Sequence, residues 1–362
     1  RKARLLHLHL LQGMMKKNVD YSRFGLKNRI LLRVTHIMGL PFSYQWKAKR
    51  YERVSTKEKR GHDLHMSNGA FELMTHVWHP EQFAEKIRVP FEGIDCLIPA
   101  KYSGSSGSAL FVQYGNTRLL IDAGKPGKQV EGALRGIGVE PETLSGVLIT
   151  HEHSDHIQGA GVLARKYSLP LYATAGTWAA MEGKIGKVPP DFRREIQAER
   201  EFYLGDVGVV PFPIPHDAAD PVGFRLYGGS LSIAAATDLG HFSRYVYDQI
   251  AGSDLILLES NHDPDMLRAN PHYNAMLKAR ILGDHGHLSN ESCAEALLRL
   301  VAAGTGTVLL GHLSGENNTP ELARRVSTEI LAREGITAGK DMRLDVALRD
   351  RTGMVYTIRS KE

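Results

Sequence analysis

The most chemically informative stretch of the chain is the hexapeptide at residues 151–156, His-Glu-His-Ser-Asp-His. Three imidazoles and an aspartate this close together would lose their hydration in a folded core and would need partners. Imidazole nitrogens and carboxylate oxygens are also common ligands of divalent metals. His151 and His153, two residues apart, can turn toward one ion, whereas Asp155 and His156 can reach a second. The hexapeptide therefore predicts a site for two metals.

Three further candidate ligands lie downstream, and each follows a short run of residues typical of a strand. A single histidine at such a position is usually a structural residue, but the shared position at strand ends favours a common site. The predicted ligands of the two metals are His151, His153 and His216 for one, and Asp155, His156 and His312 for the other. Asp238 would bridge both metals through its two carboxylate oxygens. Nitrogen and oxygen ligands suit zinc, manganese or iron, so the residues leave the metal open.

The elements that would hold these ligands follow from short apolar runs for strands and longer amphipathic segments for helices. Together they predict an α/β fold that opens with a three-stranded meander. The expected strands are 95–99, 109–113, 117–121, 146–150, 169–173, 209–215, 222–227, 231–237, 254–259, 307–311, 343–348 and 354–358. The expected helices are 157–167, 176–182, 242–250, 275–282, 290–302 and 319–334, with a polar connection up to residue 200.

Five motifs in the same order resemble the WalJ (also called YycJ) group of the metallo-β-lactamase superfamily, over residues 93–360. They are Ser-Gly-Ser-Ser-Gly at 103–107, Leu-Ile-Asp-Ala-Gly at 120–124, Leu-Glu-Ser-Asn-His-Asp at 258–263, Gly-His-Leu-Ser-Asn at 286–290 and His-Leu-Ser-Gly-Glu-Asn-Asn at 312–318. The resemblance implies a four-layer αββα sandwich with a dinuclear metal site at one edge. It also implies a metal-dependent phosphodiesterase that degrades DNA as a 5′ to 3′ exonuclease. Ser108 departs from the group, in which we expect Asn.

Hydrolysis of a phosphodiester also fits the residues themselves. Two cations roughly 3.5 to 4 Å apart lower the pKa of a shared water and stabilise the attacking and leaving oxygens of an in-line displacement. We expect Asp155 to be required for catalysis as a ligand. Asp122 is either an acceptor for the free N–H of a ligating histidine or a turn-forming aspartate. His287 is interpreted as a donor or general acid for the phosphate or leaving group; the alternative is that His287, not His312, binds metal.

Contacts to the substrate are less clearly marked. The loop with Ser103, Ser105 and Ser106 could present backbone N–H groups and hydroxyls to a phosphate, although such loops are often simple turns. Asn290 is assigned to the same substrate-binding set. Lys184 and Lys187 could contact a nucleic-acid backbone or lie in a solvated turn.

Spacing and ligand type separate the possible activities. Only 73 residues lie between Asp238 and His312, too few for the large insertion that β-CASP nucleases carry there. Class B1 β-lactamases use a cysteine in the second metal site, where this chain offers Asp238. A glyoxalase-II-like thioester hydrolase shares the hexapeptide and the bridging aspartate and stays open as an alternative. A metal-binding interaction module without catalysis is the alternative from another class of protein.

The net charge of +5 is unevenly distributed along the 362 residues. Residues 1–60 contain 16 Lys and Arg against 3 Asp and Glu, or +13, so the other 302 residues carry −8. The predicted catalytic domain, 93–362, is therefore acidic. We expect residues 1–92 to be a basic extension outside the catalytic fold, either a disordered arm that binds nucleic acid or sequence that precedes the true start of the domain.

Cysteine content and hydropathy bear on location. The two cysteines, Cys96 and Cys293, are far apart and lack metal-type spacing, which fits a reducing cytoplasm. No apolar run approaches the roughly 20 residues that span a bilayer. We therefore expect a cytoplasmic enzyme with a DNA substrate, two divalent metal ions and no membrane segment; the sequence identifies no protein partner.

Overall fold

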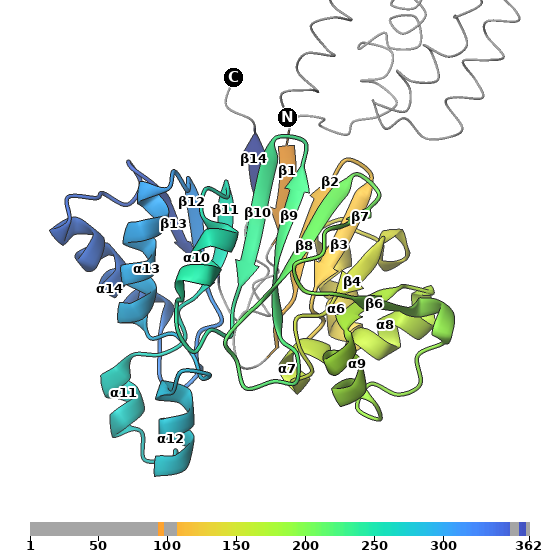
Figure 1. Cartoon of the computed structure of the whole chain (residues 1–362), viewed down its shortest axis with the longest axis horizontal. Coiled ribbons are helices and arrows are strands. Elements are labelled where there is room, and N and C mark those ends of the chain that lie inside the picture. Colours follow the sequence, from red (N-terminus) through yellow and green to blue (C-terminus); the bar gives the residue numbers. More distant parts are fainter. Residues whose placement is uncertain (1–92, 98–106, 348–354, 360–362) are drawn as a thin grey trace, which may run out of the picture. The chain divides into compact units, whose positions relative to one another are not determined.

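The computed structural model of the chain describes residues 93–97, 107–347 and 355–359. Within them, two seven-stranded sheets pack against each other (Figure 1). The first has the order β14-β1-β2-β3-β4-β5-β6 and the second β13-β12-β11-β10-β9-β8-β7. The first contains β1 (Gly93–Leu97), β2 (Leu110–Tyr114), β3 (Thr117–Ile121), β4 (Gly146–Leu148), β5 (Leu171–Thr174), β6 (Arg193–Ile196) and β14 (Val355–Arg359). The second contains β7 (Phe202–Leu204), β8 (Val207–Pro213), β9 (Val222–Gly228), β10 (Leu231–Ala236), β11 (Leu255–Glu259), β12 (Thr307–Gly311) and β13 (Arg343–Val346).

Side chains that alternate along each strand build three separate layers of core. In β3, Leu119 and Ile121 belong to the core between the sheets, whereas Leu120 faces the helices outside. In β12, Leu309 points inward and Leu310 outward. Because successive side chains of a strand point to opposite faces, strands that are apolar on both faces must be covered on both. The result is the four-layer αββα sandwich that the resemblance implies.

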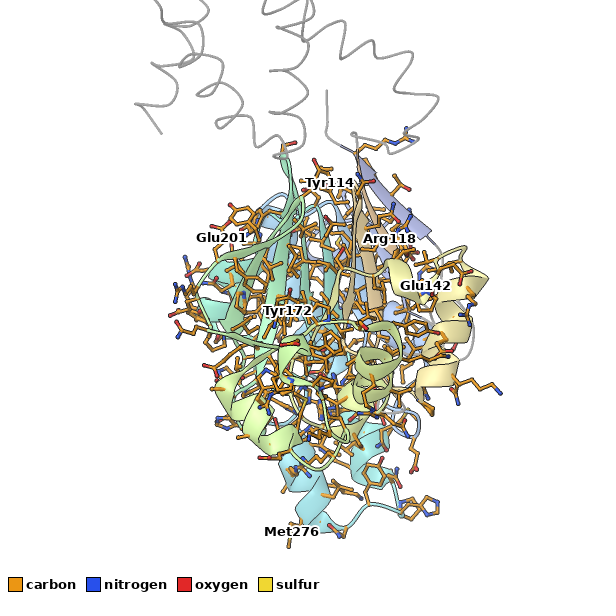
Figure 2. The ribbon with its side chains drawn as sticks, turned by 90° about the vertical axis from the view of Figure 1, so that its right-hand side faces the viewer. Tyr114, Arg118, Glu142, Tyr172, Glu201 and Met276 are labelled. Atoms are coloured by element: carbon orange, nitrogen blue, oxygen red, sulfur yellow. The ribbon has the colours of Figure 1, made fainter. Side chains whose placement is uncertain are left out.

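Helices cover both outer faces of the sandwich (Figure 1). The first sheet is covered by α6 (Gly127–Gly136), α8 (Ala160–Tyr167) and α9 (Ala175–Met181), and the second by α10 (Arg244–Ile250), α13 (Asn290–Ala302) and α14 (Pro320–Arg333). Three short helices, α7 (Ser154–Ile157), α11 (Pro264–Ala269) and α12 (Ala275–Leu282), lie at the same end of the sandwich, α11 and α12 side by side and α7 apart from them. Figure 2 shows Met276 of α12 at that end and Tyr114 of the β2–β3 hairpin at the other.

The strands that precede the candidate ligands all point toward the end that carries α7 and α12. β3 and β4 are parallel, as are β10, β11 and β12. β8 is antiparallel to β9, which is antiparallel to β10, so β8 runs in the same direction as β10. The residues that follow these strands therefore gather at one edge, where ligands of open α/β sheets bind.

Some expected elements differ from the structure. Helix α6 was not expected, β6 lies in the segment taken for a polar connection, and β7 follows that segment as a further unexpected strand. The expected helix 157–167 is two helices, α7 and α8, separated at Gly159. A side chain there would collide with the carbonyl oxygen of Lys125, because the backbone N–H of Gly159 donates to the carbonyl of Ala123.

The predictions for residues 1–92 fall outside the described residues. Within the described part of the chain, no helix combines the length and apolar character needed to cross a membrane.

A close backbone contact joins the end of β3 to the metal-ligand hexapeptide. Ser108 donates its N–H to the carbonyl of Asp155, 2.6 Å away, and accepts from the N–H of Gly124 at 2.8 Å. A Cβ at Gly124 would overlap the carbonyl of Asp155. The backbone of Ser108, the residue that departs from the family pattern, therefore still holds the hexapeptide in place.

We predict that Gly124→Ala lowers the free energy of unfolding by about 1–3 kcal/mol, because the methyl group displaces fixed backbone. Gly132→Ala is the matched control, since Gly132 lies inside α6 with no atom near its Cβ position. That change should stabilise the protein by about 0.5–1 kcal/mol. Urea unfolding of both variants measures the difference; equal stability for Gly124→Ala and the parent protein would contradict this account of the contact.

Candidate active site

Three histidines from two loops form the first group of the candidate site. His151 lies three residues after the end of β4, and His153 is the N-cap residue of α7. Nε2 of His151 lies 3.1 Å from Nδ1 of His153, and Nε2 of His216 lies 3.3 Å from the same nitrogen. One ligand atom from each of the three residues can therefore reach a single ion.

The second group joins the hexapeptide to the loop after β12. The carboxylate of Asp155 lies 3.7 Å from Nε2 of His156 and 3.6 Å from Nε2 of His312. Asp238, at the end of β10, stands between the groups: Oδ2 lies 3.5 Å from Nε2 of His156, and Oδ1 lies 3.8 Å from Nε2 of His216. The structure thus brings all seven predicted ligands together, and Asp238 lies between the groups, since the Oδ1 that approaches His216 is also 3.5 Å from Nδ1 of His312.

Three of these strand ends share a strained backbone. Asp122, Asp238 and His312 have φ angles of 63°, 61° and 54°, in the left-handed region that costs residues other than glycine roughly 1–2 kcal/mol. All three follow a buried strand by one or two residues. Such strain persists where surrounding contacts fix the backbone, and it is common at functional sites. The left-handed backbone conformation turns each of these three side chains away from the sheet and into the site.

The buried polar atoms of the site fit divalent cations. His156 is fully buried, and its Nδ1 is 2.8 Å from Oδ2 of Asp122. Its Nε2, like Oδ2 of Asp238, is buried without a hydrogen-bond partner among the described residues. Burial opposes a charge on His156, but Asp238, Asp122 and Asp155 outweigh it and raise the pKa of the imidazole to about 9. The cluster of carboxylates therefore attracts positive charge, which cations would supply in place of protons.

The remaining contacts of the Asp122 carboxylate fix the orientation of His156. Oδ1 accepts from the backbone N–H of Thr150 and Oδ2 from its hydroxyl, both at 2.8 Å. Thr150 ends the run that leads into the hexapeptide. The geometry is that of an acceptor for a ligating histidine, the first of the two interpretations of Asp122. With Nδ1 as the donor to Asp122, Nε2 carries the lone pair that faces the metal group.

Glu259, at the end of β11, is a site residue to which the sequence analysis assigned no role. It is fully buried. Oε2 accepts from the backbone N–H of Leu239 at 2.6 Å and of Leu288 at 3.1 Å, while Oε1 lies 2.8 Å from Nδ1 of both His287 and His312. The sequence did contain a signal for this residue, because a charged side chain ends an otherwise apolar strand, much as the predicted ligands follow theirs.

His287 lies beside the metal groups and is tied to Glu259. Burial lowers the pKa of its imidazole, but the negative charge and hydrogen bond of Glu259 outweigh burial and raise it above the usual value. His287 belongs with Asp238, Glu259 and His312 to a further group that could hold a metal ion. Only His312 also approaches the carboxylate of Asp155, and this contact favours His312 as the ligand of the second group.

The predicted substrate contacts have different outcomes. Ser103, Ser105 and Ser106 lie outside the described residues. Asn290 is fully buried: its Oδ1 accepts from the hydroxyl of Ser260 at 2.7 Å, and its amide exchanges hydrogen bonds with that of Asn318. This network joins the loops after β11 and β12, so the side chain supports the site and is not available to a substrate. Lys184 and Lys187 are exposed, which fits either interpretation of them.

Comparison with protein families agrees with this geometry. The model of the β-lactamase superfamily domain matches residues 117–313, which contain every predicted ligand. The chain belongs to the metallo-β-lactamase superfamily. Members of this superfamily bind divalent metals through His and Asp clusters, and the chain has such clusters at the edge of its sandwich. Both the fold class and the family expected from the motifs are confirmed.

Relatives within the superfamily place the chain in the WalJ/YycJ family. The exodeoxyribonuclease WalJ of Streptococcus pneumoniae is 41% identical over 244 residues, which cover 67% of this chain and 90% of that protein. The exodeoxyribonuclease YycJ of Bacillus anthracis is 40% identical over 238 residues, 66% of this chain and 90% of that protein. Among solved structures, the metallo-β-lactamase-fold protein YhfI of Bacillus subtilis superposes with a TM-score of 0.55 at 18% identity, covering 74% of this chain and all of that one. Zn²⁺-bound PqqB of Methylobacterium extorquens gives 0.55 at 18%, covering 72% and 99%.

We predict that Asp122→Asn lowers metal affinity by roughly 10- to 100-fold. One carboxylate oxygen becomes an NH₂ donor, so the three donors from Thr150 and His156 can no longer all be accepted. Metal content after dialysis against a graded chelator measures the loss. Asp254→Asn is the control, because that carboxylate also accepts a backbone N–H, from Ser232, but lies away from the site. Unchanged affinity in Asp122→Asn would contradict the proposed role.

Proposed function

We propose that the protein is a metal-dependent phosphodiesterase that removes nucleotides from DNA in the 5′ to 3′ direction. The observation that carries the proposal is the pair of ligand groups on either side of Asp238, with His287 held beside them by Glu259. A site of this kind can stabilise both charged oxygens of a phosphoryl displacement while a neighbouring acid serves the leaving group. The WalJ and YycJ relatives, named as exodeoxyribonucleases, support the choice of DNA.

His151, His153 and His216 would hold one divalent cation and Asp155, His156 and His312 the other, with Asp238 shared between them. When bound, the two cations would supply the activated water and the positive charge that stabilises the phosphate in the transition state. Zinc and manganese both suit this donor set, and iron also matches it. Buried carboxylates orient two of these ligands, since Asp122 accepts from Nδ1 of His156 and Glu259 from Nδ1 of His312.

The chain provides the proton that the reaction needs. The oxygen of water forms the new bond to phosphorus, the P–O3′ bond breaks, and a proton must reach O3′. Nδ1 of His287 donates to Glu259, so Nε2 is the nitrogen that can hold and deliver this proton. The products are a nucleotide with a 3′-hydroxyl and a DNA strand shortened by one residue that carries a 5′-phosphate.

We also propose a cytoplasmic location. Cys293 is free and buried, and burial raises the pKa of its thiol to about 12. An unpaired structural thiol of this kind suits a reducing compartment.

The decisive experiment is time-resolved digestion of end-labelled duplex DNA, RNA and a thioester with added manganese or zinc. We expect progressive release of nucleotides from DNA 5′ ends, and loss of that release in Asp155→Ala with the fold retained by circular dichroism. Full activity of Asp155→Ala would exclude the two-metal mechanism. Cleavage of the thioester without nucleotide release would instead identify a glyoxalase-II-like hydrolase, and metal-loaded protein inactive on every substrate would identify a binding module.

We predict that His287→Ala lowers the turnover number by roughly 10²- to 10⁴-fold, the usual contribution of a general acid, while metal content is preserved. Single-turnover digestion and metal analysis of the same preparation test both parts. His272→Ala is the control, because His272 is an exposed histidine of the loop that precedes α12. Loss of one metal equivalent in His287→Ala would show that His287 is a ligand.

A further inference from the structure

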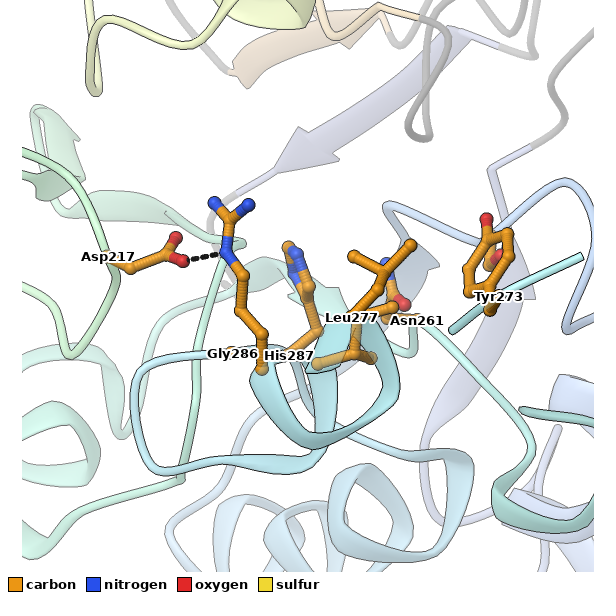
Figure 3. A pocket seen from close by; sticks show the side chains of 9 residues that line it. Asp217, Asn261, Tyr273, Leu277, Gly286 and His287 are labelled. Atoms are coloured by element: carbon orange, nitrogen blue, oxygen red, sulfur yellow. Dashed lines mark hydrogen bonds and ion pairs between the residues drawn. The ribbon is translucent and has the colours of Figure 1, made fainter. Parts of the chain in front are cut away.

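A cavity of about 170 Å³ opens beside His287 (Figure 3). Its wall is formed by the loops after β8, β11 and β12 and by α12 with its flanking residues. The lining residues include Asp217, Asn261, Tyr273, Leu277, Arg280 and His287. The cavity thus adjoins the metal site without containing any of the seven predicted metal ligands.

The place of His287 in the cavity wall determines which part of a substrate the cavity can receive. If Nε2 of His287 protonates the leaving O3′, the sugar that carries O3′ must lie against this histidine. The nucleotide that leaves therefore lies on the cavity side, and the remaining strand lies on the other side of the phosphate. In a 5′ to 3′ exonuclease the leaving nucleotide is the 5′-terminal one. This step rests on the function proposed above.

The lining provides separate contacts for the parts of one nucleotide. In Figure 3, Arg280 and Tyr273 lie at opposite ends of the cavity, with His287, Leu277 and Asn261 between them. An engineered cavity of roughly 150 Å³ admits benzene, so this one has room for one planar ring system and excludes a base pair. An aromatic ring beside an aliphatic side chain is a sequence-tolerant platform on which a base can stack.

The charge at the other end suits a phosphate. Arg280 uses its Nε to pair with the carboxylate of Asp217, and the Nη end of its guanidinium extends beyond this pair (Figure 3). The side chain of Arg280 is 57% exposed. The planar fork of a guanidinium binds phosphate oxygens in a bidentate manner, and the pair with Asp217 holds this fork in a fixed orientation.

Helix α12 is built for contact with something outside the core. Its eight residues are all described, and none of them is fully buried. Asn274 caps its first turn by accepting from the N–H of Leu277, and its side-chain links to other elements are the pair between Arg280 and Asp217 and the hydrogen bond from Nζ of Lys278 to the carbonyl of Arg268. A helix with so little burial gains stability from whatever occupies the cavity that Leu277 lines.

We propose that this cavity is the subsite for the 5′-terminal nucleotide, in which Tyr273 stacks on the base and Arg280 binds the 5′-phosphate. The subsite selects chain ends, because a phosphate at Arg280 must be the terminal one when a single nucleotide fills the cavity. Each cleavage leaves a new 5′-phosphate on the shortened strand, so the strand can enter the subsite again for the next step.

The test follows single steps of digestion on 3′-labelled DNA that begins with either a 5′-phosphate or a 5′-hydroxyl. With the wild-type holoenzyme, we expect the first cleavage of 5′-hydroxyl DNA to be at least roughly tenfold slower than that of 5′-phosphate DNA, as expected for the loss of a charge-assisted pair. Later cleavages should proceed at the same rate for both. Equal first steps in the wild-type enzyme would overturn the assignment of the phosphate.

Variants test the two residues separately. Arg280→Gln should bring the first-step rates of the two ends within about twofold, and Arg280→Lys should retain part of the difference because it keeps the charge but not the fork. Arg244→Gln is the matched control, since Arg244 is an exposed arginine that also pairs through Nε with an aspartate, Asp248, on the surface of α10. A wild-type ratio in Arg280→Gln would contradict the proposal.

For Tyr273, the substrates carry either a normal or an abasic 5′-terminal nucleotide. Tyr273→Leu should slow removal of the normal nucleotide by at least about fivefold relative to the abasic one. Tyr273→Phe, which keeps the aromatic ring, should restore the wild-type ratio of these two rates. The control Tyr203→Leu, on the exposed edge strand β7, should also show the wild-type ratio. Equal slowing on both substrates would refute stacking. A wild-type enzyme that digests DNA without these differences refutes the subsite alone, whereas one that releases no nucleotide from any DNA end refutes the proposed function.

Discussion

The buried carboxylates at one edge of the sandwich are the constraint on which the rest of the site depends. Asp122, Asp238 and Glu259 are each at most 2% exposed, and an isolated buried charge is costly unless it is paired and hydrogen-bonded. Asp122 and Glu259 meet that requirement with backbone N–H groups and histidines. Asp238 does so only in part, because Oδ2 has no hydrogen-bond partner among the described residues. The arrangement is complete only when positive charge lies between the ligand groups.

The fold provides this edge through the direction of its strands. Parallel strands in both sheets end at the same side, and each delivers a polar residue just after its last buried position. The backbone there is strained at Asp122, Asp238 and His312, and the loops are held by contacts such as that of Ser108 with Asp155. These contacts keep the ligand atoms in place at the edge of the sandwich.

The sequence predicted the parts of the site that rest on local patterns. Each ligand directly follows a strand-like run, so His216, Asp238 and His312 could be joined to the hexapeptide before the strand order was known. Glu259 has the same signal, but its role depends on four partners, from Leu239 to His312, that come together only in the folded chain. Asn290 shows the opposite error: a polar residue in a family motif looked like a contact for substrate, yet its partners Ser260 and Asn318 are buried with it. Helix α6 and strand β6 were missed because one is rich in glycine and the other exposes three of its four side chains.

The segment between β11 and β12 separates substrate selection from metal binding. It contains α11, α12 and the loop with His287, but none of the seven predicted metal ligands. Arg280 joins it to Asp217, the neighbour of His216, and the backbone N–H of His287 donates to the carbonyl of Ile281 at 3.0 Å. The proposed proton donor and most of the cavity wall are therefore parts of one stretch of chain, residues 261–287, which Asp217 and Ser314 complete. In the proposed subsite, a nucleotide against α12 would therefore lie one backbone hydrogen bond, from His287 to Ile281, away from the loop that positions His287.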